Sequence, residues 1–239
     1  MEAIILAGGA GTRLNSVVPD LPKPMADIQG RPFLAYLLDH LVRQGVDRAL
    51  LSVGYRHEAI TRHFGRGYQG MAIDYLIEEQ PLGTGGALRQ ALLAAVDREV
   101  AVVNGDTYFG VDLRAMLASH RRQEAEITMG LKAVAESGRY GTVLFGAEAR
   151  ITGFKEKGGE GPGYINAGVS IIDWGLVARL HSFGNVFSFE QEFLAAEIAQ
   201  LKAYAFVSEA FFIDIGIPED YQRAQAVLNQ EVAREVASC

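Results

Sequence analysis

Residues 6–14 read LAGGAGTRL, and residues 22–24 read PKP. Glycine has no Cβ, so a glycine-rich loop lets the backbone approach a ligand closely and adopt positive φ. Successive N–H groups in such a loop form a concave site for an anion. Arg13 and Lys23 add positive charge, and the prolines on either side of Lys23 stiffen the segment that carries it. The stretch therefore predicts a phosphate-binding loop.

Segments with strand and helix patterns alternate around this loop. The expected strands are residues 2–6, 47–53, 72–77 and 100–104, and the expected helices are residues 32–44, 56–64 and 84–96. In residues 32–44 the apolar positions recur at helical spacing, and Gly45 closes the helix. This alternation is typical of a parallel sheet wrapped by helices.

The second half of the chain has a different pattern. Extended runs cover residues 125–134, 140–145, 150–156 and 163–172, with little helix between them. Ser188 and Gln191 then fit a capping box that opens a helix. Residues 203–214 read as strand, and Pro218 starts a final helix. We therefore expect an α/β protein with a Rossmann-like mixed, mostly parallel sheet, flanking helices and an added antiparallel ribbon, in a single domain over residues 1–239.

The composition narrows the class of protein. The chain has 239 residues, 49% of them hydrophobic, and a formal net charge of −7. No basic block is present, which argues against a nucleic-acid partner. The first apolar run is too short for a signal peptide, and no run approaches the roughly 18 apolar residues of a membrane helix. With Cys239 as its only cysteine, the chain is expected to be cytoplasmic, without a membrane partner.

Two aspartates stand where strands end or are interrupted. Asp106 closes the sequence NGD directly after the strand at 100–104, and Asp214 interrupts the apolar run FFIDIGI. Ligands of parallel sheets collect at the carboxyl ends of the strands. An unpaired buried aspartate is costly, so a positive group is expected near each one. The alternative is that either aspartate only caps a turn.

The five histidines fit no catalytic or ligand spacing. We expect them at the surface or on helix faces: His40, His57, His63, His120 and His181.

Three known loop motifs can be compared with residues 6–14. The dinucleotide fingerprint fits Gly9 and Gly11 but fails at Leu14, and the Walker motif lacks its Gly-Lys-Ser/Thr ending. The third pattern, L-x-G-G-x-G-T-R-L followed by P-K-P, resembles the signature of the sugar-1-phosphate nucleotidyltransferases, also called nucleotide-sugar pyrophosphorylases. The resemblance implies a nucleotide-diphospho-sugar transferase fold. It also implies that a nucleoside triphosphate and a sugar 1-phosphate react to give a nucleotide-sugar and pyrophosphate.

The resemblance also implies catalytic, metal-binding and nucleotide-binding roles, most of them for residues in about the first 110, the nucleotide-binding half. Arg13, Lys23 and Asp106 would be catalytic, with Thr12 and Arg13 on the leaving phosphates and Lys23 on the reacting phosphate. Asp106 and Asp214 would hold Mg²⁺. The nucleotide-binding residues would be Leu6, Gly8, Gly9, Gly11, Thr12, Arg13, Glu78, Gly83 and Gly85. A carboxylate at Glu78 would accept N–H groups of guanine, whereas Glu79 and Gln80 are expected in a solvated turn.

Residues from about 111 to 239 resemble the sugar-binding half of the family, through GRYGTV (138–143), FKEKG (154–158) and YINAGVSI (164–171). The residues implied to bind the sugar phosphate are Gly141, Glu156, Lys157 and Asn166. Lys157 would hold the phosphate, and Glu156 and Asn166 would bond sugar hydroxyls.

Within the family, the motifs PKPMA, EEQPLGTGGA, RYGTV, FSFEQEFL and FFIDIGIPEDY are most similar to those of the D-glycero-α-D-manno-heptose 1-phosphate guanylyltransferases. This branch implies GTP and a heptose 1-phosphate that becomes a glycan precursor. The alternatives are a uridylyl- or thymidylyltransferase acting on a hexose or amino-sugar 1-phosphate, and a non-catalytic relative that senses a nucleotide-sugar. A dehydrogenase is disfavoured by Leu14. A homo-oligomer is compatible with the sequence.

Overall fold

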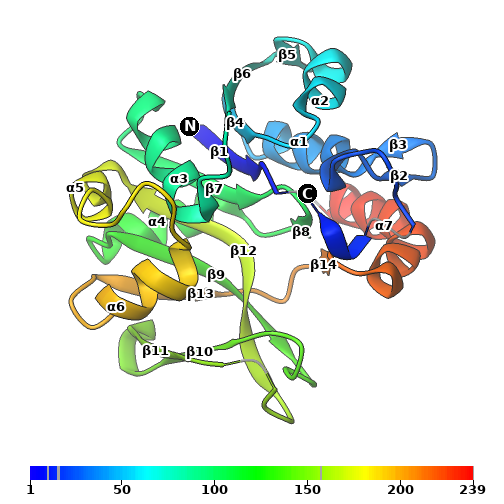
Figure 1. The fold of residues 1–239 in the computed structure, drawn as a ribbon. Helices are drawn as coiled ribbons and strands as arrows, with labels where there is room; N and C mark the ends of the chain where they lie inside the picture. Colours follow the sequence, from blue (N-terminus) through cyan, green and yellow to red (C-terminus); the bar gives the residue numbers. More distant parts are fainter. Residues whose placement is uncertain (10, 15–16, 157, 239) are drawn as a thin grey trace.

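The computed structural model describes residues 1–9, 11–14, 17–156 and 158–238. Its main sheet has the strand order β11-β10-β12-β7-β1-β4-β6-β5 (Figure 1). The parallel strands are β1 (Glu2–Ala7), β4 (Arg48–Val53), β6 (Met71–Ile77) and β7 (Glu99–Asn104). Because β1 lies between β4 and β7 and runs parallel to both, the carboxyl ends of these strands meet at one edge of the sheet.

The remaining strands complete a mixed sheet. They are β5 (Gly67–Tyr68), β9 (Ile127–Val134), β10 (Thr142–Phe145), β11 (Ile151–Lys155), β12 (Gly163–Asp173) and β13 (Ala203–Val207). The long strand β12 is antiparallel to β7, β9 and β10, and β10 and β11 form an antiparallel pair. The expected fold class, a mostly parallel sheet with an added antiparallel ribbon, is confirmed.

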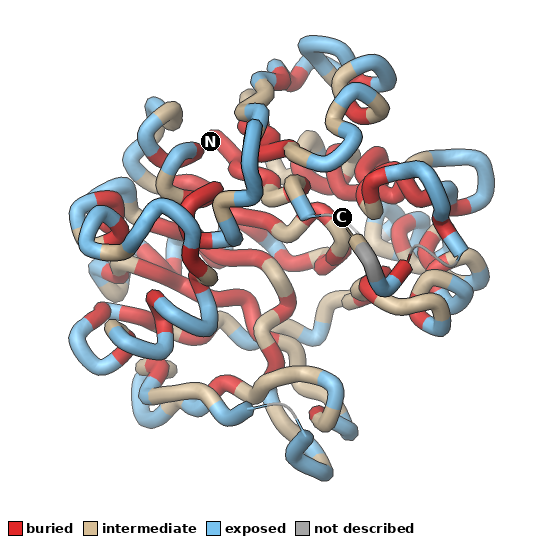
Figure 2. The backbone as a smooth tube through the Cα atoms, viewed as in Figure 1, coloured by how far each residue is buried: buried red, intermediate tan, exposed pale blue. Residues whose placement is uncertain are grey.

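Helices cover both faces of the sheet. They are α1 (Phe33–Arg43), α2 (His57–Phe64), α3 (Gly83–Ala94), α4 (Leu113–Arg122), α5 (Val177–Leu180), α6 (Ala195–Glu197) and α7 (Pro218–Ser238). Successive side chains of β1 point to opposite faces, so Ile5 packs in the cluster that contains α1, α2 and α4, and Ile4 packs with α3 and α5. Figure 2 shows the central strands as mostly buried. In the described part of the chain no helix is long and apolar enough to cross a membrane.

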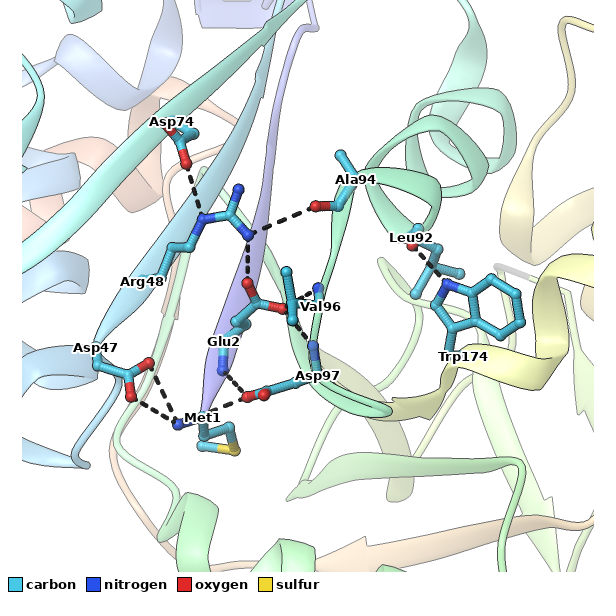
Figure 3. Close-up of polar contacts among 10 residues, drawn as sticks. All are labelled: Met1, Glu2, Asp47, Arg48, Asp74, Leu92, Ala94, Val96, Asp97 and Trp174. Atoms are coloured by element: carbon cyan, nitrogen blue, oxygen red, sulfur yellow. Dashed lines mark hydrogen bonds and ion pairs between the residues drawn. The ribbon is translucent and has the colours of Figure 1, made fainter.

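A buried carboxylate ties together the amino ends of the central strands (Figure 3). Glu2 is only 4% exposed, and it accepts hydrogen bonds from the backbone N–H groups of Val96 and Asp97 at 2.6 and 2.7 Å. Arg48 of β4 donates to Glu2 and, at 2.8 Å, to Asp74 of β6. Burial raises the pKa of Glu2, but the N–H donors and Arg48 outweigh it and leave that pKa below its usual value. The network fixes β1 against its neighbours at the edge opposite the phosphate loop.

A small two-stranded sheet completes the other edge. It pairs β8 (Thr107–Phe109) with β14 (Phe212–Asp214) in antiparallel register. Tyr108 points to α7, where its hydroxyl donates to Glu235 at 2.6 Å. The C-terminal helix therefore supports the strand pair that contains Asp214 and directly follows Asp106.

The remaining elements are short. They are η1 (Thr12–Leu14), η2 (Lys23–Met25), β2 (Asp27–Ile28), β3 (Arg31–Pro32), η3 (Ala147–Ala149), η4 (Trp174–Leu176) and η5 (Phe189–Leu194), of which η5 is π-helical and the other helices are 3₁₀.

Two features of the fold differ from expectation. Residues 203–214 do not form one strand, because β13 pairs with β9 whereas β14 pairs with β8 in another sheet. The chain leaves the first sheet after Val207 in order to reach the second. The sequence patterns do not predict helix α4, although Asp112 caps it by accepting the N–H groups of Arg114 and Ala115 at 2.9 and 3.0 Å.

Two histidines lie on helix faces, one of the two expected positions, but these faces of α1 and α4 are buried. His40 is 5% exposed and His120 is 1% exposed. Each has a buried partner: His40 Nε2 donates to the Val111 carbonyl at 3.1 Å, and His120 Nδ1 lies 2.9 Å from the Thr128 hydroxyl. Burial, assisted by the positive charge of Arg43, lowers the pKa of His40 to about 4.

The pH dependence of stability tests the environment of His40. Because the folded state favours neutral His40, its contribution is complete above pH 6.5 and is lost as the pH falls toward 4. At about pH 5 the loss is roughly 2 kcal/mol of unfolding free energy. His40→Gln removes this titration, so its difference from wild type in urea unfolding should change by that amount between about pH 7.5 and about pH 5. His63→Gln, at an exposed position, is the control, and a pH-independent difference for His40→Gln would contradict the assignment.

Candidate active site

A cavity of about 680 Å³ lies at the carboxyl ends of the parallel strands. Six of the residues predicted to bind nucleotide line it: Leu6, Gly8, Gly9, Gly11, Glu78 and Gly83. Lys23 and Asp106 also line this cavity. The loop after β1 therefore lies beside the lysine and one of the two aspartates singled out in the sequence.

Two glycines of the loop leave room for functional side chains. A Cβ on Gly8 would lie 2.3 Å from Oε1 of Glu78, and one on Gly11 would lie 2.6 Å from Cγ of Lys23. Gly11 also has φ +63°, which side-chain-bearing residues rarely adopt. The glycines thus let Glu78 and Lys23 pack directly against the backbone of the loop.

Lys23 is aimed at Asp106. It begins the 3₁₀ turn Lys23–Met25 after Pro22, and its Nζ lies 3.1 Å from Oδ2 of Asp106. The Lys23 side chain is 13% exposed. An ammonium group has three N–H donors, so this contact leaves two for a ligand in the cavity.

Asp214 approaches the same point from β14. Opposite Asp214 in the strand pair is Thr107, and the N–H of Ile215 donates to the Asp106 carbonyl at 3.0 Å. Burial and then the negative charge of Asp106 raise the pKa of Asp214 to about 6. A divalent cation bound to both aspartates would stabilise their ionised forms and so lower the pKa of Asp214 again. Carboxylate oxygens are the ligands that Mg²⁺ prefers. No group of three or more metal-ligating side chains occurs in the described residues, so phosphate oxygens would have to complete the shell.

A second cavity, of about 310 Å³, adjoins the first. Gly141, Glu156 and Asn166, all predicted to bind the sugar phosphate, line it together with Asp214. The two cavities share Asn104 and Asp106. A molecule in one can therefore meet a molecule in the other beside Asp106.

Other predicted residues lie elsewhere or are not described. Arg13 is exposed and does not line either cavity. Gly85 is covered by Phe187, whose ring would lie 2.1 Å from a Cβ at that position. Lys157 and the side chain of Thr12 lie outside the described residues. The roles of these four residues remain predictions.

Several lining residues were missed in the sequence. Asn104 stands two residues before Asp106, so its place at the end of β7 was available as a signal. Glu79 is exposed as expected but also lines the nucleotide cavity. Tyr55 lines the same cavity. Glu190 lines the second cavity, and no local pattern separates it from Glu192.

The model of the nucleotidyl transferase family matches residues 2–231. The chain belongs to this family. Among nucleotidyl transferases it is 49% identical to the D-glycero-alpha-D-manno-heptose 1-phosphate guanylyltransferase of Aneurinibacillus thermoaerophilus, over 97% of this chain and all of the other. It is 41% identical to the protein of the same name from Campylobacter jejuni, over 92% and 97% of the two chains. The crystal structure of HddC from Yersinia pseudotuberculosis complexed with GMP-PN matches with a TM-score of 0.83 and 37% identity, over 95% and 99% of the two chains.

The packing of Lys23 on Gly11 can be tested by Gly11→Ala. The new Cβ would displace Lys23, so kcat of nucleotidyl transfer should fall by on the order of 10²-fold, as expected for a misplaced catalytic group. Gly30→Ala is a matched control, because Gly30 has φ +85° but open space around it. Both variants should lose about 1 kcal/mol of unfolding free energy from backbone strain. Equal kcat values in the two variants would show that Gly11 is not needed to place Lys23 for catalysis.

Proposed function

We propose that the chain transfers the guanylyl group of GTP to D-glycero-α-D-manno-heptose 1-phosphate. An oxygen of the sugar phosphate attacks the α-phosphorus of GTP in line, the bond to the bridging oxygen breaks, and pyrophosphate leaves with the bonding electrons. The products are the GDP-sugar and pyrophosphate. The observation that carries this proposal is the meeting of Lys23, Asp106 and Asp214 where two cavities share a wall.

Catalysis of this reaction requires mainly that the protein position the two substrates and stabilise negative charge. The attacking phosphate oxygen is ionised at neutral pH, so no general base is needed. Charge grows on the α-phosphoryl oxygens in the transition state, and a fixed ammonium group there stabilises that state more than the ground state. We assign this role to the ammonium group of Lys23. Its hydrogen bond to Asp106 holds the Lys23 side chain toward the point where the two cavities meet. The loop N–H groups around Gly8 to Gly11 hold the phosphates.

Asp106 and Asp214 are proposed to hold Mg²⁺ between them. When bound, the ion polarises the α-phosphoryl group and screens it from an anionic nucleophile. The two aspartates supply hard oxygen ligands, and the antiparallel pair β8–β14 fixes their separation.

The choice of substrates rests on the relatives and on the shape of the site. The two curated relatives named above are heptose 1-phosphate guanylyltransferases, and the HddC crystal contains GMP-PN. The 680 Å³ cavity is proposed for GTP and the 310 Å³ cavity for the sugar. The division into a nucleotide half up to about residue 110 and a sugar half after it is part of this proposal.

A pyrophosphate-release assay tests the function. We expect turnover with GTP, heptose 1-phosphate and Mg²⁺, and kcat/KM at least about 10-fold lower when UTP, dTTP, CTP or ATP replaces GTP. Lys23→Ala should lower kcat by on the order of 10²-fold or more. Lys202→Ala, a change at a surface lysine paired with Glu124, should leave kcat unchanged.

Two results would overturn the proposal. Preference for UTP or dTTP would assign the chain to the uridylyl- or thymidylyltransferases. Nucleotide-sugar binding without any pyrophosphate release would assign it to the non-catalytic relatives.

A further inference from the structure

Glu190 lies within the motif FSFEQEFL (187–194), to which the resemblance assigns no role, and it lines the second cavity. It lies in the first turn of η5, and it lines the cavity together with Asn166 of β12. Glu192, two residues later, caps the helix instead, because its Oε1 accepts the N–H of Ser188 at 2.7 Å. The capping box expected from Ser188 and Gln191 therefore uses Glu192 as its reciprocal partner. One glutamate of the segment caps the helix, and Glu190 faces the cavity.

Two irregularities of the backbone bring Glu190 and Asn166 together. The pairing of β12 with β9 shifts between Asn166 and Ser170, and such a bulge re-aims the side chain beside it. On the other side, η5 is a π-helical turn, a conformation that occurs often at functional sites. Glu190 accepts a hydrogen bond from the Asn166 amide across the cavity wall.

The amide of Asn166 has a fixed orientation. Its Oδ1 accepts the N–H of Gly168 at 3.0 Å, so its Nδ2 must point the other way, to Oε1 of Glu190. One N–H of Asn166 and Oε2 of Glu190 then have no hydrogen-bond partner in the described part of the chain. A donor and an anionic acceptor lie side by side on the wall of the cavity.

The helix segment that carries Glu190 is held rigidly. The N–H of Phe189 donates to the hydroxyl of Thr84 at 2.9 Å, and the N–H of Gly85 donates to the Phe187 carbonyl at 2.9 Å. Thr84 itself lines the nucleotide cavity. The first turn of α3 thus fixes the backbone beside Glu190, and the bond from Asn166 orients its exposed carboxylate.

We propose that Glu190, together with the amide of Asn166, binds two adjacent hydroxyl groups of the sugar and thereby selects the sugar substrate. One hydroxyl donates to Oε2 of Glu190, and its neighbour accepts the remaining N–H of Asn166. This pairing fits a polyhydroxylated sugar and satisfies both free groups. The inference rests on the proposed function, because it takes the second cavity as the sugar site.

Glu190→Gln changes this acceptor with little other disturbance. The amide oxygen of the new side chain can still accept from Asn166, whereas an NH₂ group replaces the carboxylate oxygen in the cavity. A charge-assisted hydrogen bond is about twice as strong as a neutral one, so KM for heptose 1-phosphate should rise about 10-fold or more. KM for GTP should stay within about 2-fold of wild type, because Glu190 does not line the GTP cavity. Glu192→Gln is the matched control and should leave both KM values unchanged.

Heptose 1-phosphates that each lack one hydroxyl complete the test as a double-mutant cycle. For one analogue, removal of the hydroxyl should raise KM about 10-fold in wild type and leave it unchanged in Glu190→Gln. If every analogue affects the two enzymes equally, Glu190 does not contact the sugar and the inference is wrong. It is also wrong if Glu190→Gln has the wild-type KM while Glu190→Ala does not, since Glu190 would then only orient Asn166. Failure of the proposed function would look different, because wild type itself would release no pyrophosphate.

Discussion

The contact between Lys23 and Asp106, 3.1 Å long and spanning 83 residues of sequence, is the point around which the molecule is organised. It can form only because β1 and β7 are parallel neighbours whose carboxyl ends lie at the same edge of the sheet. The loop after β1 leads to Lys23, and the turn after β7 carries Asp106. A register shift between these two strands would separate the cation from the acid.

The two edges of the sheet differ in how their charges are balanced. At the amino ends, Glu2 and Arg48 form a satisfied network that ties the central strands together. At the carboxyl ends, Asp214 is partly buried beside Asp106, so like charges lie close together and the pKa of Asp214 rises to about 6. That arrangement is unfavourable in the empty protein and becomes favourable when a cation binds. The support of β8 and β14 by α7, through Tyr108 and Glu235, holds the acids in place without a ligand.

The sequence predicts the parallel half of the fold well, because local signals and tertiary structure agree there. Strands at residues 2–6, 47–53 and 72–77, and helices between them, lie within one or two residues of the observed elements. The split of residues 203–214 was not predictable from local pattern, since both pieces are apolar and extended. Only their partners in two different sheets distinguish them.

The site is predictable where one motif carries several functional residues. Gly8, Gly9, Gly11 and Lys23 are predicted on that basis, and all of them line the first cavity, as does Asp106, which is predicted from its place after a strand. Arg13 belongs to the same motif but does not line the cavity. The position of Glu190 is not predictable from local sequence, because it depends on a π-helical turn and on a bulge in β12, which is distant in sequence. Gly85 makes room for Phe187 in the structure, and its predicted contact with a ligand stays a prediction. Sequence alone does not separate a glycine needed for a ligand from one needed for a neighbouring side chain.

The most direct measurement of the central claim is a crystal structure with a non-hydrolysable GTP analogue, Mg²⁺ and a sugar 1-phosphate. The account predicts the α-phosphate beside Nζ of Lys23, with the ion between Asp106 and Asp214 and the sugar in the adjoining cavity. It is contradicted if the triphosphate binds elsewhere, or if it binds in the loop with its α-phosphate away from Lys23 and both aspartates.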